Sequence, residues 1–187
     1  MWEAIFLDRD GTIVEDAGYI RAPRDIRLIA GAVAAIKRMN DAKIPVIVIS
    51  NQSGVARGLL TEDDVALCNQ ELQEHLQKVG AHVDKFYWCP HHPKNDFAPY
   101  AMDCECRKPK PGMLKRAALD FGIDLTRSAI VGDKASDIGA GLAVGAKTVL
   151  VLTGSGKDEH SSWQEEFKPN FIANDLAHAS DFLLAKS

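Results

Sequence analysis

Short apolar runs alternate along the chain with longer segments whose apolar residues recur at helical spacing. The runs have the length and composition of buried strands and lie at residues 4–7, 44–49, 85–88, 128–131, 147–152 and 170–173. The helix-length segments between them lie near residues 31–42, 62–79, 111–121, 136–144 and 175–185. This alternation predicts an α/β fold, a Rossmann-like parallel sheet with helices on both faces.

The segment 62–79 is the clearest of the predicted helices. Thr61 is a suitable N-cap residue, acidic residues 62–64 favour the positive end of the helix dipole, and Gly80 ends the pattern. Cys68 falls within the apolar stripe of this helix. We therefore expect Cys68 to be a small buried core residue rather than a reactive thiol.

Three longer stretches without periodicity lie at residues 8–30, 89–110 and 153–168. Irregular stretches of this length in a compact domain are usually functional. The 187-residue chain has no internal repeat and no linker-like segment. We expect residues 1–187 to form a single domain in which residues 89–106 are an inserted loop.

Composition and charge exclude several classes of protein. The chain is 46% apolar and 26% charged, which is ordinary for a globular protein. Its net charge of −4 argues against sequence-independent binding of nucleic acid, which needs a basic surface. The apolar run at residues 4–7 is too short for a leader or a membrane span. We expect a cytoplasmic monomer without nucleic-acid or membrane partners.

Chemically active side chains follow four of the predicted strands. Asp8 and Asp10 follow the first strand, Ser50 follows the second, Lys108 comes past the third and Asp133 follows the fourth. Ligands of open parallel sheets bind beyond the carboxyl ends of the strands. We therefore expect these side chains to meet at one edge of the sheet.

These residue types fit phosphoryl transfer. Several carboxylates share a pocket in ionised form only when a cation offsets their repulsion, and oxygen ligands of this kind suit Mg²⁺. A carboxylate can also be a covalent nucleophile that forms an aspartyl-phosphate. Lys108 and Ser50 would supply positive charge and a hydroxyl to the phosphoryl oxygens.

Four motifs, IFLDRDGT, VISNQSG, RKPKPGM and IVGDKASD, resemble in order and spacing those of the haloacid dehalogenase-like phosphatases. The resemblance spans nearly the whole chain. It implies that Asp8 is the nucleophile, that Asp10 is the general acid and base, and that Ser50 and Lys108 hold the phosphoryl oxygens. It also implies a Mg²⁺ site made by Asp8, the backbone carbonyl of Asp10, and Asp133.

Two further expectations come from the spacing of these motifs. Asp137 either orients Lys134 or a metal-bound water, or is an acid at a helix N-terminus. The segments between the motifs leave no room for the cap domain that many members of the family carry. Substrate selection would then fall to residues 15–25 and to the loop at residues 89–106.

Cysteine and histidine are concentrated in that loop. Cys89, Cys104, Cys106 and one of His91 and His92 supply the ligands of a closed, tetrahedral zinc site. A disulfide would leave one of three cysteines unpaired, and a single histidine makes an iron–sulfur cluster less favoured. We expect a structural Zn²⁺, and the chemistry of the residues admits either histidine.

The same loop resembles the zinc loop of cap-less phosphatases of the family that act on heptose bisphosphates. The zinc ligands of these enzymes correspond to Cys89, His91, Cys104 and Cys106. Histidinol-phosphate phosphatases are the alternative to the heptose enzymes and have the same zinc chemistry. In them, the loop between the zinc-binding histidine and the C-x-C motif is shorter than residues 92–103 of this chain. One departure from the heptose enzymes is Ser50, where they carry threonine. Because serine also has a hydroxyl group, we expect little loss of function.

Two more segments, DAGY at residues 16–19 and NQSGVARG at residues 51–58, are similar to the heptose enzymes. We expect a phosphorylated sugar to be the partner of this chain. The resemblance implies substrate contacts at Asp16, Gly18, Tyr19, Asn51, Gln52 and Ser53.

Basic residues allow two interpretations. Arg107 has the planar guanidinium that binds a second phosphate in bidentate fashion, and we expect Lys134 to contact the substrate as well. Lys115 and Arg116 have the pattern of solvated helix charges. The sequence TGSGK at residues 153–157 lacks the spacing of a phosphate-binding loop and predicts a glycine-rich turn.

Two non-enzymatic classes fit less well. A receiver-like phosphoacceptor domain gives no reason for Asp10 or for the zinc loop. A zinc-stabilised binding module that has lost catalysis is disfavoured because the full set of predicted catalytic residues is present.

Overall fold

The structure is a computed structural model that describes residues 1–94, 98–162 and 168–185. Residues 95–97 of the predicted zinc loop and residues 163–167 of the predicted irregular stretch lie outside the described residues, as do residues 186–187.

Six parallel strands form a single sheet, as the alternating pattern predicts. Their order across the sheet is β3-β2-β1-β4-β5-β6. The direction of winding reverses between β1 and β4, and ligands of such sheets bind beyond the strand ends at this reversal. The strands are β1 (Ile5–Leu7), β2 (Val46–Asn51), β3 (Lys85–Cys89), β4 (Ala129–Gly132), β5 (Lys147–Val151) and β6 (Phe171–Ala173).

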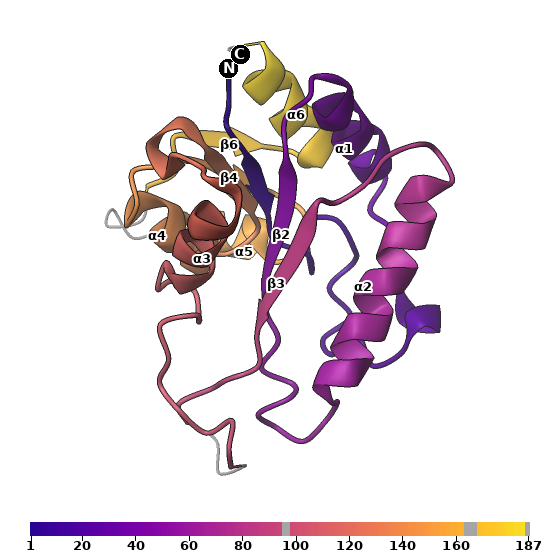
Figure 1. Ribbon diagram of the computed structural model, residues 1–187, viewed down its shortest axis with the longest axis vertical. Helices are drawn as coiled ribbons and strands as arrows, with labels where there is room; N and C mark the ends of the chain where they lie inside the picture. Colours follow the sequence, from indigo (N-terminus) through magenta and orange to yellow (C-terminus); the bar gives the residue numbers. More distant parts are fainter. Residues whose placement is uncertain (95–97, 163–167, 186–187) are drawn as a thin grey trace.

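Helices cover both faces of the sheet (Figure 1). Helices α1, α2 and α6 pack on one face and share a core with Ile5 and Leu7, whereas α3 and α4 pack on the other face with Phe6. The helices are α1 (Ala32–Asp41), α2 (Glu62–Gln77), α3 (Gly112–Phe121), α4 (Ala135–Leu142), α5 (Gly156–Ser161) and α6 (Leu176–Leu184). Among the described residues the strands are joined only by helices and loops, and no cap domain is present.

Two predictions about elements are wrong in detail. Helix α5 lies in the stretch 153–168 that was predicted to be irregular, because its sequence GKDEHS has no apolar stripe. Strand β2 ends at Asn51, so Ser50 and Asn51 lie within the strand and not after it. The reason is backbone pairing: Ser50 pairs with Trp88 and Asn51 with Cys89, which extends β2 beyond its apolar run.

Helix α2 begins as the sequence predicts. The Oγ1 atom of Thr61 accepts a hydrogen bond from the backbone N–H of Asp64 at 3.1 Å, and the Asp64 carboxylate accepts one from the Thr61 N–H at 2.8 Å. Cys68 is fully buried in the core, as expected. The same face also buries the polar Asn69, which the apolar pattern does not predict.

Helix α2 offers a test of the core. Leu72 is fully buried, whereas Leu67 on the same helix is 50% exposed. We expect Leu72→Ala to lower the free energy of unfolding by about 2–5 kcal/mol, because it leaves a cavity in the core. Leu67→Ala should change it by less than about 0.5 kcal/mol. Urea unfolding of both variants checks this, and equal losses would contradict the packing described here.

Candidate active site

A cavity of about 300 Å³ opens beyond the carboxyl ends of the strands, where the winding reverses. Of the predicted site residues, only Arg107, Asp133 and the Cys/His set lie outside its lining. Gly54, Ser136 and Asp137 are additional lining residues. The predicted residues in the lining are Asp8, Asp10, Asp16, Gly18, Tyr19, Ser50, Asn51, Gln52, Ser53, Lys108 and Lys134.

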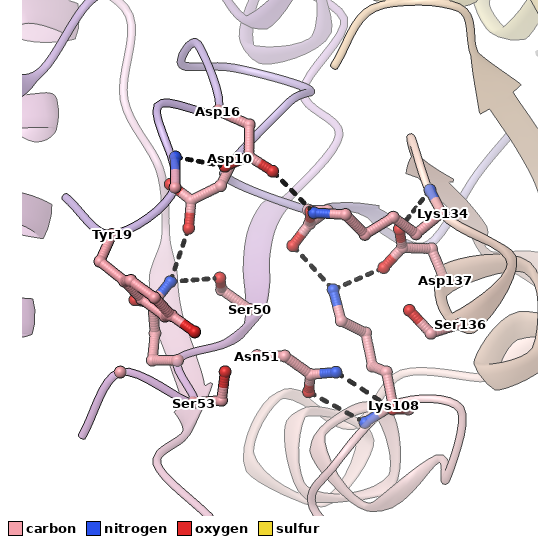
Figure 2. Close-up of a pocket in the computed structure, with 14 residues that line it drawn as sticks. Asp10, Asp16, Tyr19, Ser50, Asn51, Ser53, Lys108, Lys134, Ser136 and Asp137 are labelled. Carbon is pink, nitrogen blue, oxygen red and sulfur yellow. Dashed lines mark hydrogen bonds and ion pairs between the residues drawn. The ribbon is translucent and has the colours of Figure 1, made fainter. Parts of the chain in front are cut away.

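A buried lysine lies between two buried carboxylates at the floor of this cavity. The Nζ atom of Lys108 lies 2.7 Å from an oxygen of Asp8 and 2.5 Å from an oxygen of Asp137 (Figure 2). It also donates to the backbone carbonyl of Ile49 at 2.8 Å. Burial lowers the pKa of Lys108, but the charges of Asp137 and Asp8 outweigh it, so the pKa is raised and the ammonium form is favoured.

The position of Asp137 combines two roles. Its Oδ2 atom accepts a hydrogen bond from the backbone N–H of Lys134 at 3.0 Å, so it is an acid at the N-terminus of α4, one of the two alternatives from the sequence. Neither alternative included its ion pair with Lys108. The sequence could not reveal this pair, because it joins motifs that are far apart in the chain.

Asp133 is fully buried beside this group. Its Oδ2 atom accepts a hydrogen bond from the backbone N–H of Ser155 at 2.8 Å, whereas its Oδ1 atom has no hydrogen-bond partner among the described residues. Carboxylate oxygens of Asp8, Asp133 and Asp137 all lie within 4.8 Å of one another. An unpartnered buried carboxylate oxygen in such a cluster is what a cation-binding site presents before the cation is bound.

The crowding raises the pKa values of these carboxyl groups. Burial raises the pKa of Asp8 to about 6 against the lowering effect of Lys108, and the charges of Asp137 and Asp10 add to the rise. Burial, followed by the charge of Asp8, raises the pKa of Asp133 to about 8. Without a further positive charge, the cluster therefore does not favour full ionisation.

Glycines pack directly against the Asp133 carboxylate. A Cβ atom on Gly11 would lie 2.1 Å from its Oδ2 atom, and one on Gly154 would lie 2.3 Å from the same atom. Thr153 also donates a hydrogen bond to the carbonyl of Gly11 at 2.6 Å. Residues 153–155 of the glycine-rich segment form a turn, as predicted, whereas Gly156 and Lys157 already belong to α5. The sequence did not reveal that this turn contacts Asp133.

Asp10 and Ser50 are joined by Gln52. The Nε2 atom of Gln52 donates to an oxygen of Asp10 at 2.7 Å and to the hydroxyl of Ser50 at 2.7 Å (Figure 2). Asp10 also accepts two hydrogen bonds from Arg9, which was not among the predicted site residues. Its position between two aspartates in the first motif was the available signal.

The side-chain amide of Asn51 forms hydrogen bonds with both the backbone carbonyl and the backbone N–H of Lys108. Its Nδ2 atom donates to the Lys108 carbonyl at 3.0 Å, and its Oδ1 atom accepts from the Lys108 N–H at 3.0 Å (Figure 2). Asn51 was predicted to contact the substrate. The structure shows that its amide holds Lys108 in place.

The loop after β1 closes one side of the cavity. The Nζ atom of Lys134 donates to a carboxylate oxygen of Asp16 at 2.9 Å, and the N–H of Gly18 donates to the other oxygen at 3.0 Å. Tyr19 is 40% exposed and lines the same side. Asp16, Gly18 and Lys134 are therefore linked to each other at the cavity wall.

The Cys/His cluster lies at the end of β3. The Sγ atoms of Cys89, Cys104 and Cys106 lie 2.9–3.3 Å apart, and the Nδ1 atom of His91 lies 3.4 Å from the Cys106 sulfur. His92 lies outside the group, and its Nδ1 atom accepts a hydrogen bond from the Lys94 N–H. The structure thus brings His91 to the three cysteines, one of the two alternatives, and the four side chains could hold one metal ion.

The protonation of this cluster is uneven. Hydrogen bonding from Cys89 lowers the pKa of Cys106 to about 5 against the effect of burial, whereas burial and a hydrogen bond with Cys106 raise the pKa of Cys104. A divalent cation binds cysteines as thiolates, so its binding to this cluster would release the protons of the thiols that are not yet ionised.

Arg107 lies between Cys106 and Lys108 in the chain but does not line the cavity. Its Nη1 atom donates to the carbonyl of His91 at 3.2 Å. This contact uses one of the five guanidinium N–H groups.

Comparison with known proteins gives consistent results. The matching family model is described as HAD-hydrolase-like and covers residues 105–179. A D-glycero-D-manno-heptose-1,7-bisphosphate 7-phosphatase of Thermosynechococcus vestitus is 41% identical over 185 residues, or 96% of this chain and 94% of that protein. A D-glycero-beta-D-manno-heptose-1,7-bisphosphate 7-phosphatase of Yersinia pestis is 41% identical over 152 residues, or 81% of each chain.

A solved structure is similar over its whole length. The crystal structure of a D,D-heptose 1,7-bisphosphate phosphatase from B. bronchiseptica, complexed with magnesium and phosphate, superposes with a TM-score of 0.89 and 31% identity over 99% of both chains. In the described part of the chain, the helices are all too short or too polar to cross a membrane.

The packing of glycine against Asp133 can be tested by a matched pair of substitutions. Gly11 has a φ of +89° and Gly18 a φ of +90°, so alanine at either position should cost about 1–3 kcal/mol in backbone strain. Only at Gly11 would the new Cβ overlap Asp133, since nothing lies within 4 Å of the Cβ position at Gly18. We expect Gly11→Ala to be more destabilising than Gly18→Ala by about 1–3 kcal/mol in urea unfolding. Equal losses would show that Asp133 moves aside freely.

Proposed function

The chain belongs to the haloacid dehalogenase-like phosphatases, which are phosphoric monoester hydrolases, and on that premise we propose that it removes the 7-phosphate of D-glycero-D-manno-heptose 1,7-bisphosphate. The observation that carries the proposal is that no cap domain covers the cavity and that the Cys/His loop leads directly to Lys108 in the lining of the cavity. The names of the full-length relatives point to the same substrate.

Asp8 is the nucleophile in this proposal. Its carboxylate oxygen forms a bond to phosphorus while the bond between phosphorus and the ester oxygen breaks, which gives an aspartyl-phosphate. Lys108, 2.7 Å from Asp8, stays charged because Asp137 also pairs with it, and it can therefore neutralise an entering phosphoryl group. Ser50 supplies a hydroxyl to the same oxygens.

Asp10 carries out both proton transfers. In the first step its carboxyl proton passes to the departing ester oxygen. In the second step the carboxylate takes a proton from water, the water oxygen bonds to phosphorus, and the bond to Asp8 breaks. Its place at the cavity wall, two residues past the nucleophile, supports this division of labour.

Mg²⁺ is the cation that the acidic cluster fits. Asp8, the backbone carbonyl of Asp10, and Asp133 would hold it, and the unpartnered Oδ1 atom of Asp133 supports this assignment. When bound, the ion neutralises charge on the phosphoryl group and on the carboxylates. Asp137 would remain paired with Lys108.

Zn²⁺ is the ion proposed for the Cys/His cluster. Three sulfur ligands from Cys89, Cys104 and Cys106 and one nitrogen ligand from His91 make a closed tetrahedral set that leaves no position for a substrate. The ion would be structural and would cross-link the end of β3 to the residues just before Lys108.

Selection of the substrate falls to the loops, because the cavity has no cap domain. Tyr19, Ser53 and the pair formed by Asp16 and Lys134 line the cavity where the sugar would lie. Arg107 has guanidinium donors beyond its bond to His91 and would bind the second phosphate of the substrate.

We extend the proposal to a single-domain monomer that acts in the cytoplasm on this small sugar phosphate. None of the four cysteines is in a disulfide, which is typical of a reducing compartment. The single continuous sheet supports one domain.

The substrate proposal predicts a large difference in kcat/KM. Heptose 1,7-bisphosphate should be hydrolysed at least about 100-fold more efficiently than histidinol phosphate or a simple alkyl phosphate, because the second phosphate adds a bidentate contact of a few kcal/mol. Phosphate release from both anomers of the bisphosphate and from the two comparison esters measures this. A higher kcat/KM for histidinol phosphate would contradict the proposal.

Asp8→Asn is the control for this measurement. The variant should release no phosphate, because the amide is not a nucleophile, while circular dichroism remains unchanged because Lys108 retains its pair with Asp137. Undiminished turnover in Asp8→Asn would overturn the assignment of the nucleophile.

The zinc proposal predicts about one tightly bound zinc ion per chain in protein purified without chelators. Elemental analysis measures it, and Cys106→Ser should lower the zinc content and the melting temperature. Cys68→Ser is the matched control, since Cys68 is buried but lies outside the cluster, and it should leave the zinc content unchanged. Wild-type protein without zinc would contradict the proposal.

A further inference from the structure

Arg9 is a fully buried cation for which the mechanism above has no use. It lies between Asp8 and Asp10 in the chain and is 1% exposed. Its backbone carbonyl accepts hydrogen bonds from the N–H groups of Ile13 and Val14 at 2.9 and 3.0 Å, so its position is fixed by the turn after β1. Burying a guanidinium costs free energy unless its donors are paired, and its partners are therefore informative.

Three of its donor groups have side-chain partners. The Nε atom donates to Asp10 Oδ1 at 2.9 Å and Nη2 donates to Asp10 Oδ2 at 3.0 Å, which is a bidentate pair. The Nη1 atom donates to the Oδ1 atom of Asn69 at 2.9 Å. Asn69 is itself buried on the inner face of α2, so the guanidinium connects this helix to Asp10.

The Asp10 carboxylate is held from a second side as well. Gln52 donates to its Oδ2 atom at 2.7 Å. Rotation of the carboxylate would break both arms of the Arg9 pair and the bond to Gln52 and would leave the buried guanidinium without its anionic partner. The orientation of Asp10 thus depends on Arg9.

We propose that Arg9 is a positioning residue that holds the Asp10 carboxyl group in the orientation needed for both proton transfers. The inference rests on the proposed function, because it assigns Arg9 an effect on Asp10 and none on the substrate. Loss of the bidentate pair should slow the steps in which Asp10 moves a proton. It should not slow the attack of Asp8 on an ester whose leaving group needs no proton.

The choice of substrate separates these steps. A sugar phosphate leaves as an alkoxide and needs the proton of Asp10, whereas p-nitrophenyl phosphate leaves as a stable phenolate. With p-nitrophenyl phosphate only the second step, hydrolysis of the aspartyl-phosphate, depends on Asp10. A rapid-mixing experiment reports the two steps separately, as a burst of phenolate and as the steady rate that follows.

Arg9→Lys keeps the positive charge and removes one arm of the pair. With the sugar phosphate we expect kcat to fall roughly 10- to 100-fold, less than the loss of a general acid itself, while KM changes less than about twofold. With p-nitrophenyl phosphate we expect a burst near one phenolate per chain, formed at a rate within about threefold of wild type, before a steady rate reduced roughly 10-fold or more. A burst slowed in proportion to the steady rate, or an unchanged kcat, would overturn the inference.

Asn69→Ala provides a second test if Arg9→Lys does not fold. It removes the partner at the far end of the guanidinium without touching Asp10, and we expect the same separation of the two phases with a roughly 2- to 10-fold lower steady rate. Equal slowing of both phases would again overturn the inference. The matched control is Arg38→Lys, which alters an exposed ion pair with Asp181 and should change neither phase.

The outcome also separates this inference from the proposed function. Wild-type protein that hydrolyses neither ester would overturn the proposed function and the role of Arg9 with it. Wild-type protein that hydrolyses both esters, with no separation of phases in the variants, would overturn the role of Arg9 alone.

Discussion

The shared ion pair of Lys108 with Asp8 and Asp137 is the interaction on which the rest of the site depends. Buried carboxylates crowded at the carboxyl ends of β1 and β4 repel one another, and Lys108 is the cation that offsets them. Its charge is effective only if its backbone is fixed. The amide of Asn51 fixes that backbone from the last residue of β2.

The long loop after β3 brings Lys108 back to the carboxyl ends of the strands, where it pairs with Asp8. The chain leaves the sheet at Cys89, extends away from the sheet, and returns through Cys106 to Lys108 before α3 begins (Figure 1). The backbone N–H of Gln52 donates to the Cys89 carbonyl at 2.8 Å, so the departure point is tied to the strand that carries Ser50. A metal ion at the Cys/His cluster would tie the return point to the same place, in addition to the hydrogen bond from Arg107 to the His91 carbonyl.

The sequence predicted the sheet and the positions of most helices because buried parallel strands read as continuous apolar runs. It predicted which residues would meet because the carboxyl ends of parallel strands share one edge. It could not predict contacts between side chains. The pairing of Asp137 with Lys108 and the amide of Asn51 on the Lys108 backbone depend on orientations that spacing does not determine. Spacing also left His91 and His92 open as members of the cluster, and it was the resemblance to the family that implied His91. Helix α5 was missed because a short polar helix has no apolar period.

The two acids of the first motif are paired with different cations, and the difference matches the role proposed for each acid. Asp8 pairs with the ammonium group of Lys108, a compact charge that binds without fixing a plane and that two carboxylates already share. In the proposed mechanism, such a cation would turn to an arriving phosphoryl group and leave the Asp8 oxygen free to attack. Asp10 pairs with the planar guanidinium of Arg9, which fixes the plane of the carboxylate. A carboxylate that forms a bond to phosphorus needs a cation that can change its contacts during the reaction. A carboxyl group that donates a proton in one direction needs a cation that keeps its plane fixed.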